Sequence, residues 1–173
     1  MKKIAVIYKS KYGATKRYAQ WIAGSLEAEL FEASGVKPSQ LQDWDVVVYG
    51  GGIYASSISG VKLVAENACK SLVVFTVGIA DPAITDYSDI LAKNFKPERL
   101  PQVKAFHFRG GIDYAKLSLV HKGLMAMVNK HAQKKPTEQR TSDDLAVLET
   151  YGKKADFTDE SATRLLVEYI LAL

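Results

Sequence analysis

Four short runs of apolar residues, rich in β-branched side chains, constrain most strongly how this chain can fold, and a glycine follows each of them. Runs that are apolar throughout, without polar alternation, are typical of strands buried on both faces. Such strands occur in parallel sheets with helices on both sides. The runs predict strands over residues 3–9, 45–49, 72–77 and 103–108.

Segments between these runs have apolar residues at helical spacing, so the expected order of elements is β-α-β-β-α-β-α-β-α. A brief strand is expected over residues 30–33, before a turn at 35–39, and Thr158 is the expected N-cap of the last helix. Residues 1–173 are predicted to form a single domain. For residues 136–154 the sequence allows two alternatives, an ordered insertion or a flexible one. Helices are expected over residues 14–30, 61–70, 86–94, 114–131 and 158–173.

The composition is that of an ordinary globular protein, with 47% hydrophobic and 24% charged residues. A single cysteine, Cys69, excludes an internal disulfide and suits a reducing compartment. It is expected to be a small apolar residue of a helix. No apolar stretch approaches the ~20 residues of a membrane span, and residues 4–7 are too short for a signal-peptide core. A cytoplasmic protein is therefore expected.

The loop after the first strand, Ser10–Thr15, carries hydroxyl side chains on both sides of Gly13 and leads directly into a helix. A helix N-terminus offers free N–H groups and positive dipole charge, and glycine lets the backbone approach an anion closely. The loop therefore predicts a phosphate site, although an ordinary N-capped helix would have a similar sequence. It lacks both the Walker A and the G-x-G-x-x-G pattern, which argues against ATP and NAD.

Further glycines follow the other predicted strands, at residues 50–52, Gly78 and residues 110–111. The carboxyl ends of parallel strands meet at one edge of a sheet, where ligands of α/β proteins bind. We therefore expect these loops to lie together beside the loop at 10–15.

These loops, taken in order, resemble the flavodoxin family. The family's first loop has the pattern T/S-x-T/S-G-x-T, which Ser10, Tyr12, Gly13 and Thr15 follow with Tyr12 in place of a hydroxy-amino acid. Residues 41–54 resemble the family's third strand and the loop after it. The resemblance implies a three-layer α/β/α sandwich with a five-stranded parallel sheet in the order 2-1-3-4-5, and FMN bound without a covalent link.

The resemblance also implies which residues contact FMN. Tyr54 is the expected stacking aromatic, with Tyr87 and Tyr114 as weaker alternatives. The phosphate would lie on Ser10, Lys11, Tyr12, Gly13, Ala14 and Thr15, and the ring against Gly52, Ile53, Tyr54, Ala55, Ser56, Gly78, Ile79, Ala80, Asp81, Gly110 and Gly111.

A narrower resemblance is to the flavodoxin-type protoporphyrinogen IX dehydrogenases (quinone) of heme biosynthesis, through residues 106–114 and the basic helix through His131. It implies an oxidoreductase that oxidises a porphyrinogen and passes the electrons to a quinone. Two alternatives stay open: an FMN electron carrier without substrate chemistry of its own, and a flavin-free interaction module. No catalytic residue is assigned.

Basic residues are concentrated in residues 99–135, a segment that holds a single acidic residue, Asp113. This charge predicts an anionic small-molecule substrate or a redox partner protein, with a positive loop over residues 109–122 that attracts carboxylates. Neither nucleic-acid binding nor a metal site is expected. The basic residues are Arg99, Lys104, Arg109, Lys116, Lys122, Lys130, Lys134 and Lys135.

The helix at residues 116–130 allows two interpretations. Leu119 and Met125 lie off its main apolar stripe, beside lysines. The expected interpretation is that the stripe packs on the sheet. In the alternative, the helix rests on the inner face of the membrane, where a quinone would be dissolved. The stripe consists of Leu117, Val120, Leu124, Met127 and Val128.

Overall fold

Five parallel strands form the centre of the molecule, in the order β2-β1-β3-β5-β6, and a short strand, β4, pairs antiparallel with β3. The structure is a computed structural model that describes residues 2–173. In chain order the parallel strands follow the predicted arrangement 2-1-3-4-5. The strands are β1 (Ile4–Lys9), β2 (Glu29–Glu32), β3 (Val46–Tyr54), β4 (Ser57–Ile58), β5 (Leu72–Gly78) and β6 (Val103–Arg109).

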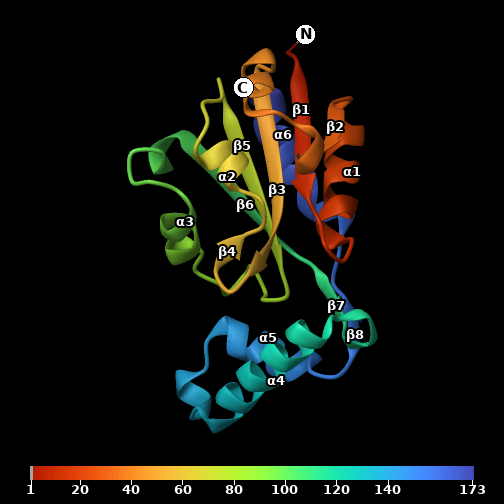
Figure 1. Cartoon of the computed structure of the whole chain (residues 1–173), viewed down its shortest axis with the longest axis vertical. Helices are drawn as coiled ribbons and strands as arrows, with labels where there is room; N and C mark the ends of the chain where they lie inside the picture. Colours follow the sequence, from red (N-terminus) through yellow and green to blue (C-terminus); the bar gives the residue numbers. More distant parts are fainter. Residues whose placement is uncertain (1) are drawn as a thin grey trace.

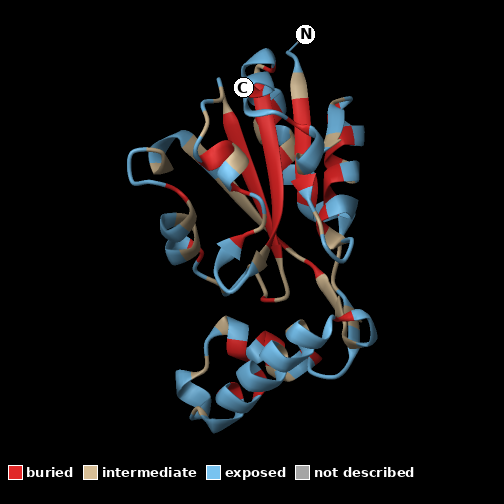
Figure 2. Ribbon diagram, in the orientation of Figure 1, coloured by how far each residue is buried: buried red, intermediate tan, exposed pale blue. Residues whose placement is uncertain are grey.

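Helices cover both faces of this sheet, which confirms the three-layer α/β/α fold (Figure 1). One face packs on α1 (Ala14–Leu26) and α6 (Arg164–Ala172). The other packs on α2 (Lys62–Ala65), α3 (Ser88–Asn94) and the 3-10 turn Pro38–Asp43. Because the strand side chains alternate between two buried cores, the strands are apolar throughout, as the sequence predicts. Figure 2 shows the sheet as the most buried part of the molecule.

The sequence predicts that the strand before residues 50–52 ends at these glycines. In the structure the glycines instead lie inside β3, which continues to Tyr54. A Cβ on Gly50 would stand 2.0 Å from Phe75 Cζ, and one on Gly51 would stand 2.7 Å from Ile58 Cγ2. These glycines therefore make room for neighbouring side chains of the sheet.

Several predicted helices are shorter than expected. The helix expected over residues 14–30 ends at Leu26, where Glu27 turns left-handed with φ 49°. The one expected over 61–70 is the single turn of α2, so Cys69 lies in the loop after it. The terminal helix begins only at Arg164, and Asp159, not Thr158, caps the 3-10 turn before it by accepting from Ser161 N at 2.9 Å.

Residues 111–156 form a projecting lobe below the carboxyl edge of the sheet (Figure 1). Its two short strands, β7 (Gly111–Asp113) and β8 (Lys154–Asp156), pair antiparallel, so the lobe leaves the sheet and returns at neighbouring positions. Between them, α4 (Leu119–Lys134) packs against α5 (Ser142–Thr150). The stretch 136–154 is therefore ordered, and neither sheet core includes a described lobe residue.

The predicted packing of the helical stripe on the sheet is wrong. Only Leu117 is buried, whereas Val120, Leu124, Met127 and Val128 are 72%, 48%, 64% and 38% exposed. The physical reason is that β7 and β8 carry the helix away from the sheet, and α4 instead buries Asn129 and Ala132. The helix also starts later than expected, after a 3-10 turn at Tyr114–Lys116. Within residues 2–173, no helix combines the length and apolar character needed to cross a bilayer.

Candidate functional site

Four of the predicted loops meet at the carboxyl edge of the sheet, next to the lobe (Figure 1). Gly110 N donates to Gly78 O at 2.7 Å, which joins the ends of β5 and β6. A Cβ on Gly78 would stand 3.6 Å from Ile53 Cδ1, and one on Gly52 would stand 3.6 Å from Thr15 Oγ1. The predicted site residues from β1, β3, β5 and β6 are therefore neighbours in space.

The loop Ser10–Gly13 and the start of α1 form a cradle that fits a phosphate. Ser10 Oγ accepts from Gly13 N at 3.0 Å, and Gly13 has φ 102°, a left-handed conformation that favours glycine. Within residues 2–173, no side chain caps α1, so its first N–H groups and its positive dipole end face the loop. Thr15, in the first turn, is almost fully buried, and its hydroxyl faces Gly52.

Tyr12, at the position where flavodoxins have a hydroxy-amino acid, faces the lobe. Its hydroxyl oxygen lies 2.7 Å from His121 Nδ1 and accepts from Ser118 N at 3.4 Å. The ammonium of Lys11 lies 5.6 Å from the centre of the Tyr12 ring. Both side chains are exposed and project from the loop, so the cradle consists mainly of backbone groups and the hydroxyls of Ser10 and Thr15.

A tight hairpin turn follows β3 at Ala55 and Ser56, both of which are left-handed, with φ 47° and 63°. Helix α3 stabilises this turn from the side. Lys93 Nζ donates to Ala55 O at 2.9 Å, and Asn94 Nδ2 donates to Ser56 O at 2.8 Å. The hairpin therefore holds Tyr54, the last residue of β3, at the edge of the site.

Tyr54 stacks on His121 of the lobe, with ring centres 5.6 Å apart and an angle of 21° between the ring planes. The Tyr12 ring meets the same imidazole edge-on at 5.7 Å. Burial raises the pKa of Tyr54, and the nearby Tyr12 adds to the shift. Tyr54 is the expected stacking partner of the flavin ring, but in the structure the side chain of His121 from the lobe lies on it. Sequence reasoning missed His121, because no local pattern connects it with residues 12 and 54.

The two alternative aromatics have other stacking partners. Tyr87 lies parallel to His107, with ring centres 3.6 Å apart, and Tyr114 meets Tyr151 edge-on within the lobe. His107 Nδ1 also lies within hydrogen-bonding distance of Thr76 Oγ1. His107 is thus a half-buried histidine whose ring has both a stacking partner and a polar partner. The described residues 2–173 contain no group of three or more metal-ligating side chains.

The loop after β5 is fixed by its own hydrogen bonds and by Arg109. Asp81 Oδ1 accepts from Ala83 N at 2.9 Å. Arg109 Nε donates to Ile79 O at 2.9 Å, and Arg109 Nη2 forms an ion pair with Glu149 Oε2 of α5 at 2.7 Å. The expected free positive charge at Arg109 is therefore neutralised, because this residue joins the sheet to the lobe.

The packing around the last two predicted site residues, Gly110 and Gly111, requires glycine. A Cβ on Gly110 would stand 2.7 Å from Val77 Cγ1, and one on Gly111 would stand 2.6 Å from Ala155 O. Both contacts are too close for a side chain. These glycines therefore allow β6 to pass into the ribbon of β7 and β8.

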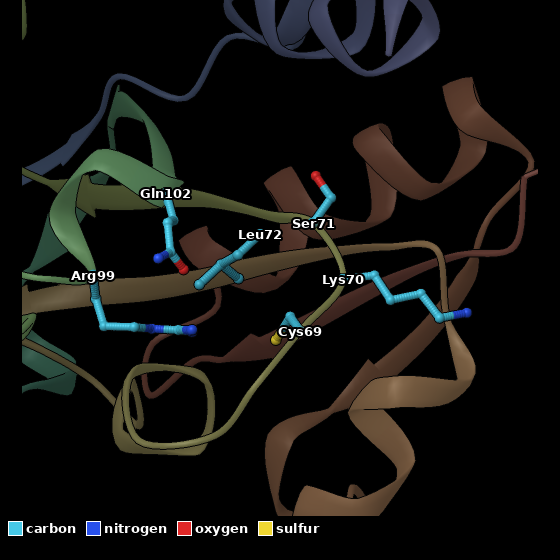
Figure 3. Close-up of a pocket in the computed structure, with 6 residues that line it drawn as sticks. All are labelled: Cys69, Lys70, Ser71, Leu72, Arg99 and Gln102. Atoms are coloured by element: carbon cyan, nitrogen blue, oxygen red, sulfur yellow. The ribbon is translucent and has the colours of Figure 1, made fainter.

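A hollow at the opposite, amino edge of the sheet, of about 280 Å³, contains no predicted site residue (Figure 3). Burial raises the pKa of the Cys69 thiol there, while Arg99 acts in the opposite direction. Arg99 itself donates to Val64 O and Asn67 O, both at 3.1 Å. The hollow is lined by Cys69, Lys70, Ser71, Leu72, Arg99 and Gln102.

Comparison with models of known protein families gives one match. The family model described as flavodoxin domain matches residues 5–139. A search of curated proteins found no match. Among solved structures, oxidised flavodoxin 2 from Bacillus cereus shares 19% identity over 62% of this chain and 84% of its own, with a TM-score of 0.47. A flavoprotein from Lactobacillus acidophilus in complex with FMN shares 13% identity over 63% and 93%, with a TM-score of 0.42. Two-electron reduced flavodoxin from Megasphaera elsdenii shares 13% identity over 60% and 82%, with a TM-score of 0.46.

Proposed function

Because this chain belongs to the flavodoxin domain family, we propose that it binds FMN at the carboxyl edge of the sheet and acts in electron transfer. The free N-terminus of α1 supports this proposal most directly. It lies beneath a glycine with φ 102°, and within residues 2–173 no side chain caps it. Such an uncapped terminus is a ready site for a phosphate group.

Of the residues around this terminus, one group would contact the phosphate of FMN and another group its ring. The hydroxyls of Ser10 and Thr15 and the N–H groups of residues 14 and 15, at the start of α1, would hold the phosphate. Ile53 and Tyr54 would flank the ring, with the backbone of residues 78–81 at its edge. When bound, FMN supplies the redox chemistry, because its ring accepts and donates electrons.

The stacking face of Tyr54 is in contact with His121, so a ring that stacks there requires the lobe side chain to move aside. Several of the contacts that hold the lobe against the sandwich are only partly buried. They include the polar contact of Tyr12 with His121, the bond from Ser118 N to Tyr12, and the ion pairs of Arg109 with Glu149 and of Arg17 with Asp156. Hydrogen bonds and ion pairs between groups with access to solvent contribute little stability, so these contacts offer little resistance to the movement.

A titration of the purified protein with FMN, followed by flavin fluorescence, tests the proposal. We expect saturable binding that the variant Thr15→Val weakens by roughly tenfold to a hundredfold, since one hydrogen bond to a charged group is worth about 1.5–3 kcal/mol. Thr150→Val is the matched control, because Thr150 is also a buried helical threonine but lies in the lobe.

The control variant should bind FMN as the unaltered protein does. Absence of binding by the unaltered protein would contradict the proposal. So would equal binding by the unaltered protein and Thr15→Val, provided that circular dichroism shows both to be folded.

A narrower form of the proposal is that the chain oxidises a porphyrinogen with a quinone as acceptor. Its support is the sequence at residues 106–114. In the fold, these residues form the end of β6, β7 and the start of the turn after it, where the lobe begins. Reduction of the bound flavin by protoporphyrinogen in anaerobic mixing would support this form. An electron carrier would instead be reduced only by a partner protein.

A further inference from the structure

Helix α4 presents its large apolar side chains to solvent. Leu119 is 86% exposed, Val120 72% and Met127 64%, and Leu124 and Val128 are also exposed. The side that packs in the lobe instead buries Asn129 and Ala132. An amphipathic helix in a folded domain normally has the opposite orientation. Figure 2 shows α4 as an exposed helix on the projecting lobe, away from the buried sheet.

The charges on α4 are all of one sign. Residues 119–134 contain three lysines and no aspartate or glutamate. Met127, Lys130 and Lys134 follow one another at spacings of three and four, so they lie along the same ridge of the helix. Lys116 precedes the helix in an exposed turn. The apolar face is therefore bordered by positive charge.

We propose that the exposed face of α4 docks on the surface of an anionic lipid bilayer. A helix with an apolar face bordered by lysines lies in the interfacial plane, where its side chains enter the acyl region and the lysines meet lipid phosphates. A second copy of the chain fits less well, because two such helices would bring like charges together with no acidic residue on α4 to pair with them. The docking surface lies outside the proposed FMN site and does not depend on it.

Co-sedimentation of the full-length protein with vesicles tests this surface. We expect binding to phosphatidylcholine vesicles that contain roughly a third phosphatidylglycerol, weaker binding at high salt, and little binding to phosphatidylcholine alone. The double variant Leu124→Ser/Met127→Ser should weaken binding by about tenfold or more, since two apolar side chains no longer enter the membrane.

The double variant Leu165→Ser/Leu171→Ser is the matched control, because these side chains of α6 are 63% and 67% exposed on a different helix. This control should bind as the unaltered protein does. Three outcomes would overturn the proposal: no binding to anionic vesicles, equal loss in both double variants, or a dimer seen by light scattering that only the α4 variant abolishes. The last result would assign the face to a second copy of the chain. A variant that still binds FMN is taken as folded. For a variant that does not bind FMN, circular dichroism shows whether it is folded.

Discussion

The imidazole of His107, a residue of β6, is half-buried. It stacks on Tyr87 and contacts the hydroxyl of Thr76. Burial lowers the pKa of His107 from 6.5 to about 4. The folded protein therefore keeps this ring neutral at pH values where the unfolded chain protonates it, and acid must destabilise the fold through this group.

The sign of the effect follows from linkage. Because the pKa is depressed in the folded state, the stabilisation is complete above about 6.5 and is lost as the pH falls toward about 4. We expect the free energy of unfolding to fall between pH ~7 and ~5 by on the order of 1–2 kcal/mol more in the unaltered protein than in His107→Gln, after allowance for the partial exposure of the ring. Urea denaturation at both pH values measures this difference, and parallel losses in the two proteins would contradict it.

At the residue scale, the sequence predicts most reliably those features that depend on residues close together in the chain. The loop at residues 10–15 could be identified because its hydroxyls, its glycine and the helix after it are contiguous in the chain. The contact of His121 with Tyr12 joins residues 109 positions apart and depends on where the lobe lies. The ion pair of Arg109 could not be predicted for the same reason, since its partner Glu149 belongs to a helix that the sequence pattern does not predict.

At the scale of elements, the close approach of β3 to β5 depends on glycine. The Phe75 ring occupies the space that a side chain at Gly50 would need, since a Cβ there would stand 2.0 Å from Phe75 Cζ. Both residues lie in the middle of the sheet and pair with each other across the two strands. Neither can move without displacing the core around it.

We therefore expect Gly50→Ala to destabilise the protein by roughly 1–3 kcal/mol or more through overpacking. The matched control is Gly24→Ala in α1, where a Cβ would meet nothing within 4 Å. This change should be neutral or should stabilise the protein by about 0.5–1 kcal/mol, because alanine favours helix. Urea denaturation of the two variants measures both values. Equal effects would show that space at Gly50 is not limiting.

The parallel strands could be predicted because burial on both faces makes each one apolar along its whole length, whatever its neighbours are. The end of β3 could not be predicted, because glycine is typical both of turns and of closely packed strands. The position of the Phe75 ring, which shows that Gly50 lies in a closely packed strand, is known only from the structure. The orientation of α4 could not be predicted from the sequence either. Its apolar stripe is the usual mark of a face packed on a core, and the sequence does not reveal that β7 and β8 carry the helix away from one.

At the scale of the whole molecule, the two chain connections between the lobe and the sandwich lie side by side. Gly111 pairs with Asp156, and Phe157 N donates to Gly110 O at 3.0 Å, so the chain leaves and re-enters the sandwich at adjoining positions. Both cores of the sandwich are assembled from residues outside 111–156. The prediction that residues 1–173 form one domain remains a prediction, and it depends on how strongly the lobe and the sandwich are coupled.

Excision of the lobe measures that coupling. We expect a variant in which a short Asn-Gly turn replaces residues 112–155 to keep the sandwich folded, because the turn can join strand ends that already lie side by side. Its urea unfolding should stay cooperative, and its binding to anionic vesicles should be lost. A variant without a cooperative transition would show that the sandwich requires the lobe, most directly through the bridge from Arg109 to Glu149.

Helix α6 returns to the sandwich only after the lobe, and its Leu166 and Ile170 are 0% and 1% exposed against the same core as Val6 and Phe75. During synthesis on the ribosome, the strands and α1 emerge well before these two side chains. One flank of the nascent sheet therefore stays open to water, and to other unfinished chains, while the whole lobe is translated. Segments of this kind are where growing polypeptides aggregate or recruit chaperones.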